Sequence, residues 1–183
     1  MKVQKRSRRR RRRRPQAEFL QNLTQNSRCP MLNPFLNPFH KTTCRQVMKM
    51  GVVFVTPDDD IQAAATKMRV HDVGFLPVCG PDHRPLGAVT DRDIAVRAVA
   101  EDKGASTPVA EVMTMDAVCV GADADLGVAE ALMMRHQKSR IMCVDGDGTL
   151  VGVVSLSDIP AFEGVRKSGA VFAKVTEHHV NRP

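Results

Sequence analysis

Two short segments of the chain place a hydroxyl three residues before a carboxylate. In the first, Thr90 precedes Asp93, and in the second, Ser155 precedes Asp158. An ionised carboxylate accepts charge-assisted hydrogen bonds and a hydroxyl can donate one, so each pair could hold a polar ligand. Each pair also lies where a strand is predicted to run into a helix, whose free N–H groups and dipole favour an anion. The same residue types form ordinary helix N-caps, so ligand binding and capping both stay open.

These segments belong to an internal repeat with a period of 65 residues. Residues 86–94 align with residues 151–159, and Val47-Met48 aligns with Val112-Met113. The register holds from residue 47 to residue 159 without an insertion or deletion. Chance similarity between apolar strands would not keep one register over this length. The chain therefore contains a duplicated unit, and each copy is small enough that we expect the two to pack together.

The positive charge of the chain is concentrated near its beginning. The 183 residues carry a formal net charge of +7, but residues 1–30 hold 11 of the 27 Lys and Arg and one acid, Glu18. The remainder has 16 basic and 19 acidic residues, a net of −3. The seven arginines from Arg8 to Arg14 predict a disordered basic leader over residues 1–43. Contact with nucleic acid would use residues 5–14 of this leader, and a translation start at Met31 would remove it.

Composition argues against several classes of protein. The cysteines are odd in number and lack a Cys-x-x-Cys spacing, which favours a reducing cytoplasm over a disulfide framework; they are Cys29, Cys44, Cys79, Cys119 and Cys143. No apolar run approaches the roughly 20 residues of a membrane span, and the leader lacks the apolar stretch of a secretory signal. The sequence shows no phosphate-binding glycine loop, nucleophile–base set or cluster of metal ligands. We therefore expect neither an enzyme nor a metal site.

Hydrophobic periodicity predicts the same five elements in each copy. The first copy should have strands at residues 52–55, 75–79 and 86–89, a helix whose N-cap and first-turn acids are Asp58 to Asp60, and a helix from 91 to about 100. The second copy should have strands at 117–120, 140–144 and 150–154, a helix at 125–136, and a helix from Leu156 that includes Pro160. The predicted fold is α/β (α+β), with two β-α-β-β-α repeats packed as a pseudo-twofold pair.

This pattern divides the chain into four parts. The basic leader covers residues 1–43, the first repeat 44–105 and the second repeat 106–164. Residues 165–183 form a C-terminal extension, in which residues 171–175 could make one or two helical turns.

The repeated unit resembles the tandem CBS-domain module, also called a Bateman module, and in particular the small stand-alone bacterial CBS-pair proteins. The resemblance covers about residues 44–164, two-thirds of the chain. It is carried by Val47-Met48, Val112-Met113-Thr114, His71 to Val78, Leu86 to Ile94, Leu150 to Ser155 and Asp158-Ile159.

The resemblance implies that adenine nucleotides bind in clefts between the paired units. In the first copy, Asp93 would accept hydrogen bonds from the ribose hydroxyls and Thr90 would donate one to a phosphate. Arg92 would neutralise phosphate charge. The adenine slot would be formed by Thr56, Phe75, Leu76 and Pro77.

The second copy keeps the motif without its local cation. Ser155 and Asp158 persist, but Leu156-Ser157 stands where the first copy has Asp91-Arg92. Arg140 or Lys138 could supply positive charge instead. We therefore expect the first copy to be the better nucleotide site.

The resemblance implies a non-enzymatic regulatory module that needs no cofactor and takes AMP, ADP or ATP as a regulatory ligand. It also implies a homodimer that signals to a regulated protein, which the sequence does not identify. Two alternatives stay open: a protein that associates with nucleic acid through its arginine-rich leader, and a structural dimer whose nucleotide sites are degenerate.

Overall fold

A computed structural model of the chain describes residues 42–163 and 165–180. The predicted leader lies outside these residues, apart from Thr42 and Thr43. The arginine run, the proposed nucleic-acid contact and the alternative start at Met31 therefore also lie outside them.

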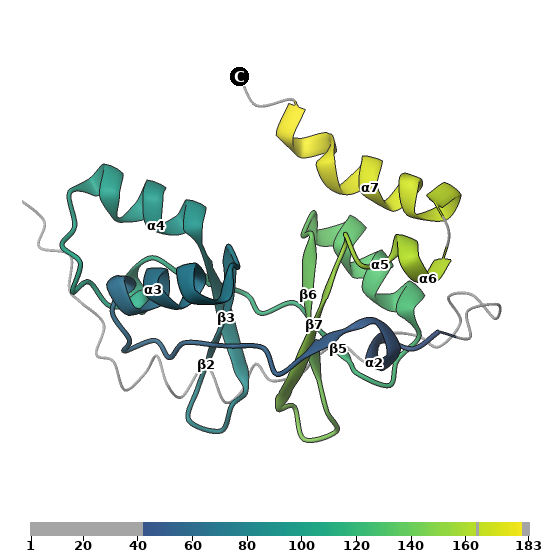
Figure 1. Ribbon diagram of the computed structural model, residues 1–183, viewed down its shortest axis with the longest axis horizontal. Coiled ribbons are helices and arrows are strands. Elements are labelled where there is room, and N and C mark those ends of the chain that lie inside the picture. Colours follow the sequence, from purple (N-terminus) through teal and green to yellow (C-terminus); the bar gives the residue numbers. More distant parts are fainter. Residues whose placement is uncertain (1–41, 164, 181–183) are drawn as a thin grey trace, which may run out of the picture. The chain divides into compact units, whose positions relative to one another are not determined.

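The first of two sheets is three-stranded and antiparallel, in the order β2-β3-β4. Its strands are β2 (Phe75–Cys79), β3 (Pro85–Thr90) and β4 (Thr114–Met115). The helices of this part of the chain are α3 (Ile61–His71), α4 (Asp91–Arg97) and two short 3₁₀ turns, η1 (Val99–Glu101) and η2 (Val109–Glu111). Figure 1 shows α3 and α4 beside β2 and β3.

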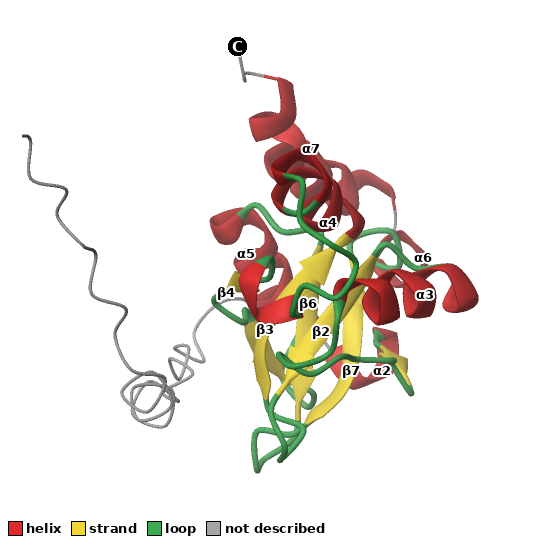
Figure 2. Cartoon of the chain, turned by 90° about the vertical axis from the view of Figure 1, so that its left-hand side faces the viewer, coloured by secondary structure: helices red, strands yellow, loops and turns green. Residues whose placement is uncertain are grey.

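The second sheet is four-stranded, in the order β1-β7-β6-β5. Its strands are β1 (Lys49–Met50), β5 (Cys119–Gly121), β6 (Arg140–Val144) and β7 (Leu150–Ser155). Strand β5 runs parallel to β6, and the other neighbours are antiparallel. The accompanying helices are α2 (Cys44–Val47), α5 (Leu126–His136), α6 (Pro160–Glu163) and α7 (Val165–Val180). Figure 2 shows strands at the centre with helices around them.

The two repeats exchange their first segments. Strand β1 comes from the start of the first repeat but pairs with β7 of the second, with Lys49 opposite Val153. Strand β4 comes from the start of the second repeat but pairs with β3 of the first, with Thr114 opposite Ala88. Each of these residues is displaced by 65 positions from its equivalent, so both exchanges follow one pseudo-twofold symmetry. We call residues 42–50 and 107–115 the crossing arms; in Figure 1 the dark blue arm lies along the green strands.

Glycine is required where each arm crosses the neighbouring sheet. A Cβ added at Gly152 would lie 2.7 Å from Met48 Sδ and 2.8 Å from the Lys49 carbonyl oxygen. A Cβ at Gly87 would clash with the Thr114 carbonyl oxygen and with the end of Met113. The matching Gly and Met residues of the repeat are thus explained by close packing of backbone on backbone.

Each arm also contributes to the core of the other repeat. Val109 and Val112 are fully buried with the residues around α3, β2 and β3. Cys44, Val47 and Met48 are buried with the residues around α5, β6 and β7. Each hydrophobic core therefore contains residues from both sequence repeats.

The two long central helices begin and end alike. The Asp60 side chain caps α3 by accepting from the Ala63 N–H, and Asp125 caps α5 by accepting from Gly127. The helices are followed by the C-cap residues Asp72 and Gln137, which both have left-handed backbone conformations. Of the predicted N-cap and first-turn acids at residues 58–60, Asp60 is confirmed as the cap, whereas the first turn of α3 contains no acid.

Several boundaries differ from the prediction. The predicted strand at residues 52–55 is reduced to a single bridge between Val55 and Val78. The predicted helix from Leu156 is wrong, since α6 begins at Pro160. The residue before a proline disfavours helical conformation, so residues up to Ile159 form turns instead. The C-terminal helix α7 has 16 residues and is longer than the one or two turns expected.

Three cysteines are buried and form no disulfide: Cys44, Cys79 and Cys143. Burial raises the pKa of the Cys79 thiol to about 11. This fully buried side chain acts as a small apolar group.

Candidate functional site

In the first repeat, the hydroxyl and the carboxylate bond to one another. Thr90 Oγ1 donates to Asp93 Oδ2 at 2.7 Å and accepts from the Asp93 N–H at 3.1 Å. Asp93 Oδ2 also accepts from the Thr90 N–H at 3.0 Å. This reciprocal cap starts α4 directly after β3. One oxygen of the Asp93 carboxylate is therefore already fully engaged.

Arg97 forms an ion pair with the other oxygen of the Asp93 carboxylate. Its Nη1 lies 3.4 Å from Asp93 Oδ1, one helical turn away. The same nitrogen donates to the Val112 and Met113 carbonyl oxygens at 2.8 and 3.0 Å, and to Thr114 Oγ1 at 3.2 Å. Arg97 thus ties the first motif to the crossing arm. We call Phe75, Thr90, Asp93 and Arg97 the first site.

In the second repeat, the same motif does not close on itself. Ser155 Oγ bonds to Ser157 Oγ at 2.9 Å, and the Asp158 N–H donates to the Ser155 carbonyl oxygen. The helix begins only at Pro160, where the first repeat has Ala95. Because α6 starts later, Asp158 is not placed to cap it as Asp93 caps α4.

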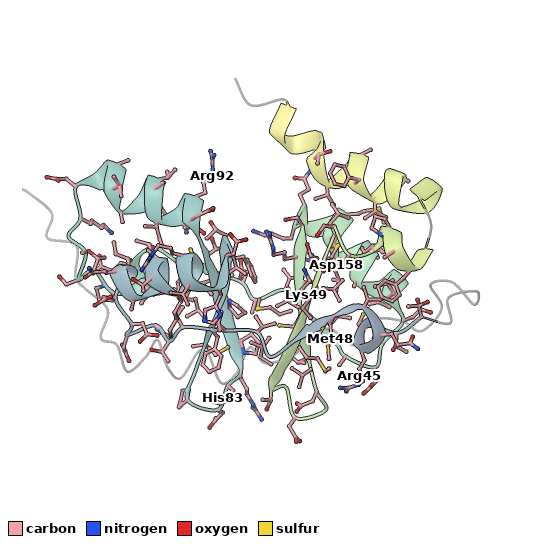
Figure 3. All side chains as sticks on the ribbon, viewed as in Figure 1. Arg45, Met48, Lys49, His83, Arg92 and Asp158 are labelled. Atoms are coloured by element: carbon pink, nitrogen blue, oxygen red, sulfur yellow. The ribbon has the colours of Figure 1, made fainter. Side chains whose placement is uncertain are left out.

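The Asp158 carboxylate is instead paired with the other crossing arm. Asp158 Oδ1 lies 3.3 Å from Lys49 Nζ, and Figure 3 shows the two side chains together. Asp158 Oδ2 is buried and accepts no hydrogen bond from any residue that the structure describes. A buried carboxylate oxygen without a donor is costly, so a hydrogen-bond donor that reached it would be stabilising.

Arg140 adds a second cation beside this motif. It stands directly opposite Ser155 in the β6–β7 ladder. Its guanidinium carbon lies 5.8 Å from the centre of the Phe75 ring, a cation–π distance. Phe75 in turn stands opposite Thr90 in the β2–β3 ladder, so the Arg140–Phe75 contact links the two motifs. We call Lys49, Arg140, Ser155 and Asp158 the second site.

The remaining predicted site residues lie outside the first and second sites, and most of them make contacts within the fold. The Thr56 N–H donates to Asp59 Oδ2 at 2.9 Å. Leu76 is buried in the first core, and the Pro77 carbonyl oxygen accepts from the Val55 N–H. Arg92 is exposed, and in Figure 3 its side chain projects away from the ribbon at the start of α4. A role for these four residues in binding a nucleotide stays a prediction.

The structure adds two residues that sequence reasoning missed. Lys49 and Arg97 each pair with a motif aspartate. The sequence separates Lys49 from Asp158 by more than one hundred residues, and no local pattern indicates that the arm crosses. A basic residue four positions after Asp93 was a usable signal for Arg97, because residues at i and i+4 of a helix are neighbours.

Residues 42–163 and 165–180 contain no group of three or more His, Cys, Asp or Glu side chains that could hold a metal ion. Within the same ranges, no helix is both long and apolar enough to cross a membrane.

Comparisons with known proteins point to one family. The model of the CBS domain matches residues 44–99 and 109–160. Hypoxic response protein 1 of Mycobacterium tuberculosis is 38% identical over 120 residues, which are 64% of this chain and 82% of that protein. The CBS domain-containing protein YhcV of Bacillus subtilis is 33% identical over 141 residues, 76% of this chain and 99% of that protein. The matched region therefore makes up most of the length of both relatives.

Solved structures agree with this fold. A crystal structure of hypoxic response protein 1 with two coordinated zinc ions has a TM-score of 0.61 and 34% identity, and covers 66% of this chain and 98% of that one. A CBS domain pair in complex with 5′-methylthioadenosine and S-adenosyl-L-methionine has a TM-score of 0.60 at 23% identity, and covers 67% and 96%. The mixed α/β fold with two repeats, predicted from the sequence, is confirmed.

Proposed function

This chain belongs to the CBS-domain family, and we propose that it is a non-enzymatic regulatory module that binds an adenosine-containing ligand and signals to a partner protein. The ligands in view are AMP, ADP, ATP and adenosyl compounds. The CBS pair crystallised with 5′-methylthioadenosine and S-adenosyl-L-methionine supports this ligand class, because it has the same fold.

The observation that carries the proposal is the state of the Asp158 carboxylate. Its Oδ2 is buried without a donor, whereas Asp93 Oδ2 already accepts from Thr90. Ribose offers two neighbouring hydroxyls, and a carboxylate can accept both. We therefore place the ribose at the second site, in preference to the first site that the sequence favoured.

The other residues of the second site suit the remainder of a nucleotide. Ser155 Oγ bonds to Ser157, an exposed partner that a ligand oxygen could replace. Arg140 provides positive charge beside Ser155 and an apolar neighbour in Phe75. The first site would serve as a second, weaker site, since a ligand there must first displace the cap and the Arg97 ion pair.

Ligand titration of the full chain tests the proposal. AMP, ADP, ATP, 5′-methylthioadenosine and S-adenosyl-L-methionine are each added at millimolar concentration, and binding is followed by calorimetry and thermal unfolding. A ligand at 100 times its Kd stabilises the folded state by about 2.7 kcal/mol, which a melting curve resolves. Asp158→Ala should abolish the shift, whereas Asp93→Ala should keep it. The absence of binding by every compound would overturn the proposal.

We further propose that the module works as a homodimer. Several apolar side chains on α3, α4 and η1 are exposed in the single chain: Val70, Val96 and Val99. Burying such side chains against a second copy would be favourable. Light scattering should give twice the chain mass, and Val96→Glu with Val99→Glu should reduce it to the monomer mass. A wild-type protein that is monomeric at micromolar concentration would contradict this.

The arginine run supports a second candidate function, contact with nucleic acid. Seven neutralised phosphates would give a slope near −6 for log affinity against log salt, at about 0.9 per contact. A chain without residues 1–30 should lose this binding and keep the response to nucleotides. Equal affinity in both chains would exclude the run as the contact.

A further inference from the structure

Lys49 enters the second site from the first repeat. Its backbone is fixed by the β1–β7 ladder, where Lys49 stands opposite Val153 and Met50 opposite Gly152. Gly152 allows the arm to approach closely, since any side chain there would meet Met48 and the Lys49 carbonyl. The position of this lysine beside the second motif is therefore built into the exchange of arms.

The ammonium group of Lys49 pairs with Asp158, but most of the Lys49 side chain is exposed to solvent. Its Nζ lies 3.3 Å from Asp158 Oδ1, while 73% of the side chain is exposed and only 18% of Asp158 is. An exposed ion pair contributes little to stability. Lys49 can therefore turn from the carboxylate to an incoming anion at small cost, because its long stem is flexible.

The first site has no equivalent of this lysine. The matching position is Thr114, whose hydroxyl accepts from Arg97. Arg97 itself is engaged by Asp93 and by two carbonyl oxygens of the arm. The arm thus brings a mobile cation to the second site and a neutral hydroxyl to the first.

We infer that Lys49 is a specificity-determining residue, which makes the second site prefer phosphorylated adenosine ligands to uncharged ones. This inference rests on the proposed function of that site. Without Lys49, the Asp158 carboxylate would repel a phosphate close to the ribose. With Lys49, the ribose hydroxyls bond to the Asp158 carboxylate while the ammonium group neutralises the phosphate. Adenosine uses only the first of these interactions.

The test compares AMP with adenosine, which differ only by the phosphate. Calorimetric titration of the full wild-type chain should show tighter binding of AMP. Lys49→Met removes the charge and keeps the apolar stem, so it should weaken AMP by about 10-fold or more and leave adenosine within about twofold. Lys49→Arg should retain the preference for AMP. Added salt should weaken AMP binding in the wild type and much less in Lys49→Met.

A matched control accounts for the loss of one positive charge. Lys103 forms a similar ion pair with Glu111 at 3.2 Å, and belongs to neither site. Lys103→Met should leave the ratio of AMP to adenosine affinity unchanged. Melting curves of both variants should stay close to that of the wild type, since each lysine forms only a partly exposed ion pair.

The outcomes separate this inference from the function on which it rests. If Lys49→Met weakens AMP and adenosine equally, Lys49 only positions Asp158 and the inference is wrong. If Lys49→Met changes neither affinity, the ratio of AMP to adenosine affinity is unchanged and the inference is also wrong. Adenosine binding by the wild type and by Lys49→Met would still support the proposed function of the second site. If the wild type binds neither compound nor any other adenosine ligand, the proposed function fails and the inference fails with it.

Discussion

At the scale of single residues, two aspartates that are equivalent in sequence have different surroundings. Asp93 caps its own helix and pairs with Arg97. Asp158 pairs with Lys49 and leaves one oxygen buried without a donor. The divergence follows from Pro160, which delays the helix start in the second repeat. Differences within and beside the motif, among them Leu156-Ser157 and Pro160, thus separate a capping residue from a candidate ligand-binding residue.

This difference predicts unequal effects on stability. Asp93→Ala removes the N3 half of the capping box of α4 and the partner of Arg97, so it should lower the free energy of unfolding by about 1 kcal/mol. Asp158→Ala removes a carboxylate with an unsatisfied buried oxygen and should cost less. Urea denaturation of the ligand-free proteins measures both values. A larger loss in Asp158→Ala would show that its carboxylate is satisfied in solution.

A salt bridge on the first crossing arm predicts a dependence of stability on pH. Arg45 Nε and Nη2 donate to the two Asp123 oxygens at 2.6 and 3.0 Å. The hydrogen bond from Arg45 lowers the pKa of Asp123 below its ordinary value of 3.8. The stabilising contribution is therefore present above that value and is lost as pH falls through the lower pKa of the folded state.

Asp123→Asn should consequently reduce the melting temperature at neutral pH and make no difference in strong acid. The matched control is Asp58→Asn, because Asp58 holds the equivalent position in the first repeat and Ala110 replaces Arg45 there. Melting temperatures of Asp123→Asn and Asp58→Asn are measured from pH 2 to pH 7. The same pH dependence in both variants would contradict a stabilising role of the Arg45–Asp123 ion pair.

At the scale of elements, the crossing arms depend on glycines in the strands they cross. Gly152→Ala and Gly87→Ala should each destabilise the fold by about 1–3 kcal/mol, because the added Cβ overlaps backbone atoms of the arm. Gly146→Ala is the control, since nothing lies within 4 Å of its added Cβ. Chemical denaturation of the three variants should separate Gly146→Ala from the other two. Equal stability of all three variants would contradict close packing of the arms against Gly87 and Gly152.

At the scale of the whole molecule, each repeat completes the core of the other. Val109 and Val112 fill the first core from the second arm, and Cys44 and Val47 fill the second core from the first arm. Burial of such side chains is the main stabilising term in folding. The two repeats should therefore not fold independently when the chain is cut at the sequence boundary.

Two fragments test this expectation. Residues 44–105 form the first repeat in sequence but lack β4, Val109 and Val112. Residues 52–116 contain β2, β3, β4 and the whole first core. The second fragment should unfold cooperatively by circular dichroism, whereas the first should show no cooperative transition. Cooperative unfolding of residues 44–105 alone would contradict the structural role of the arms.

The sequence by itself determined the duplication, the CBS family and most of the elements. These follow from patterns that are local or repeated at a fixed distance: the 65-residue period, the apolar runs of β2, β3, β6 and β7, and the acids at residues 58–60, which include the cap of α3. It also located both motif aspartates, because their spacing from a hydroxyl is a short-range feature.

Only the tertiary structure decided how the repeats combine and what surrounds each aspartate. Strands β1 and β4 have two residues each, too few for a periodic signal, and their partners lie in the other repeat. Lys49 meets Asp158 only because an arm crosses between the sheets. Contacts between residues so far apart in sequence depend on packing of the whole chain, which local propensity does not encode.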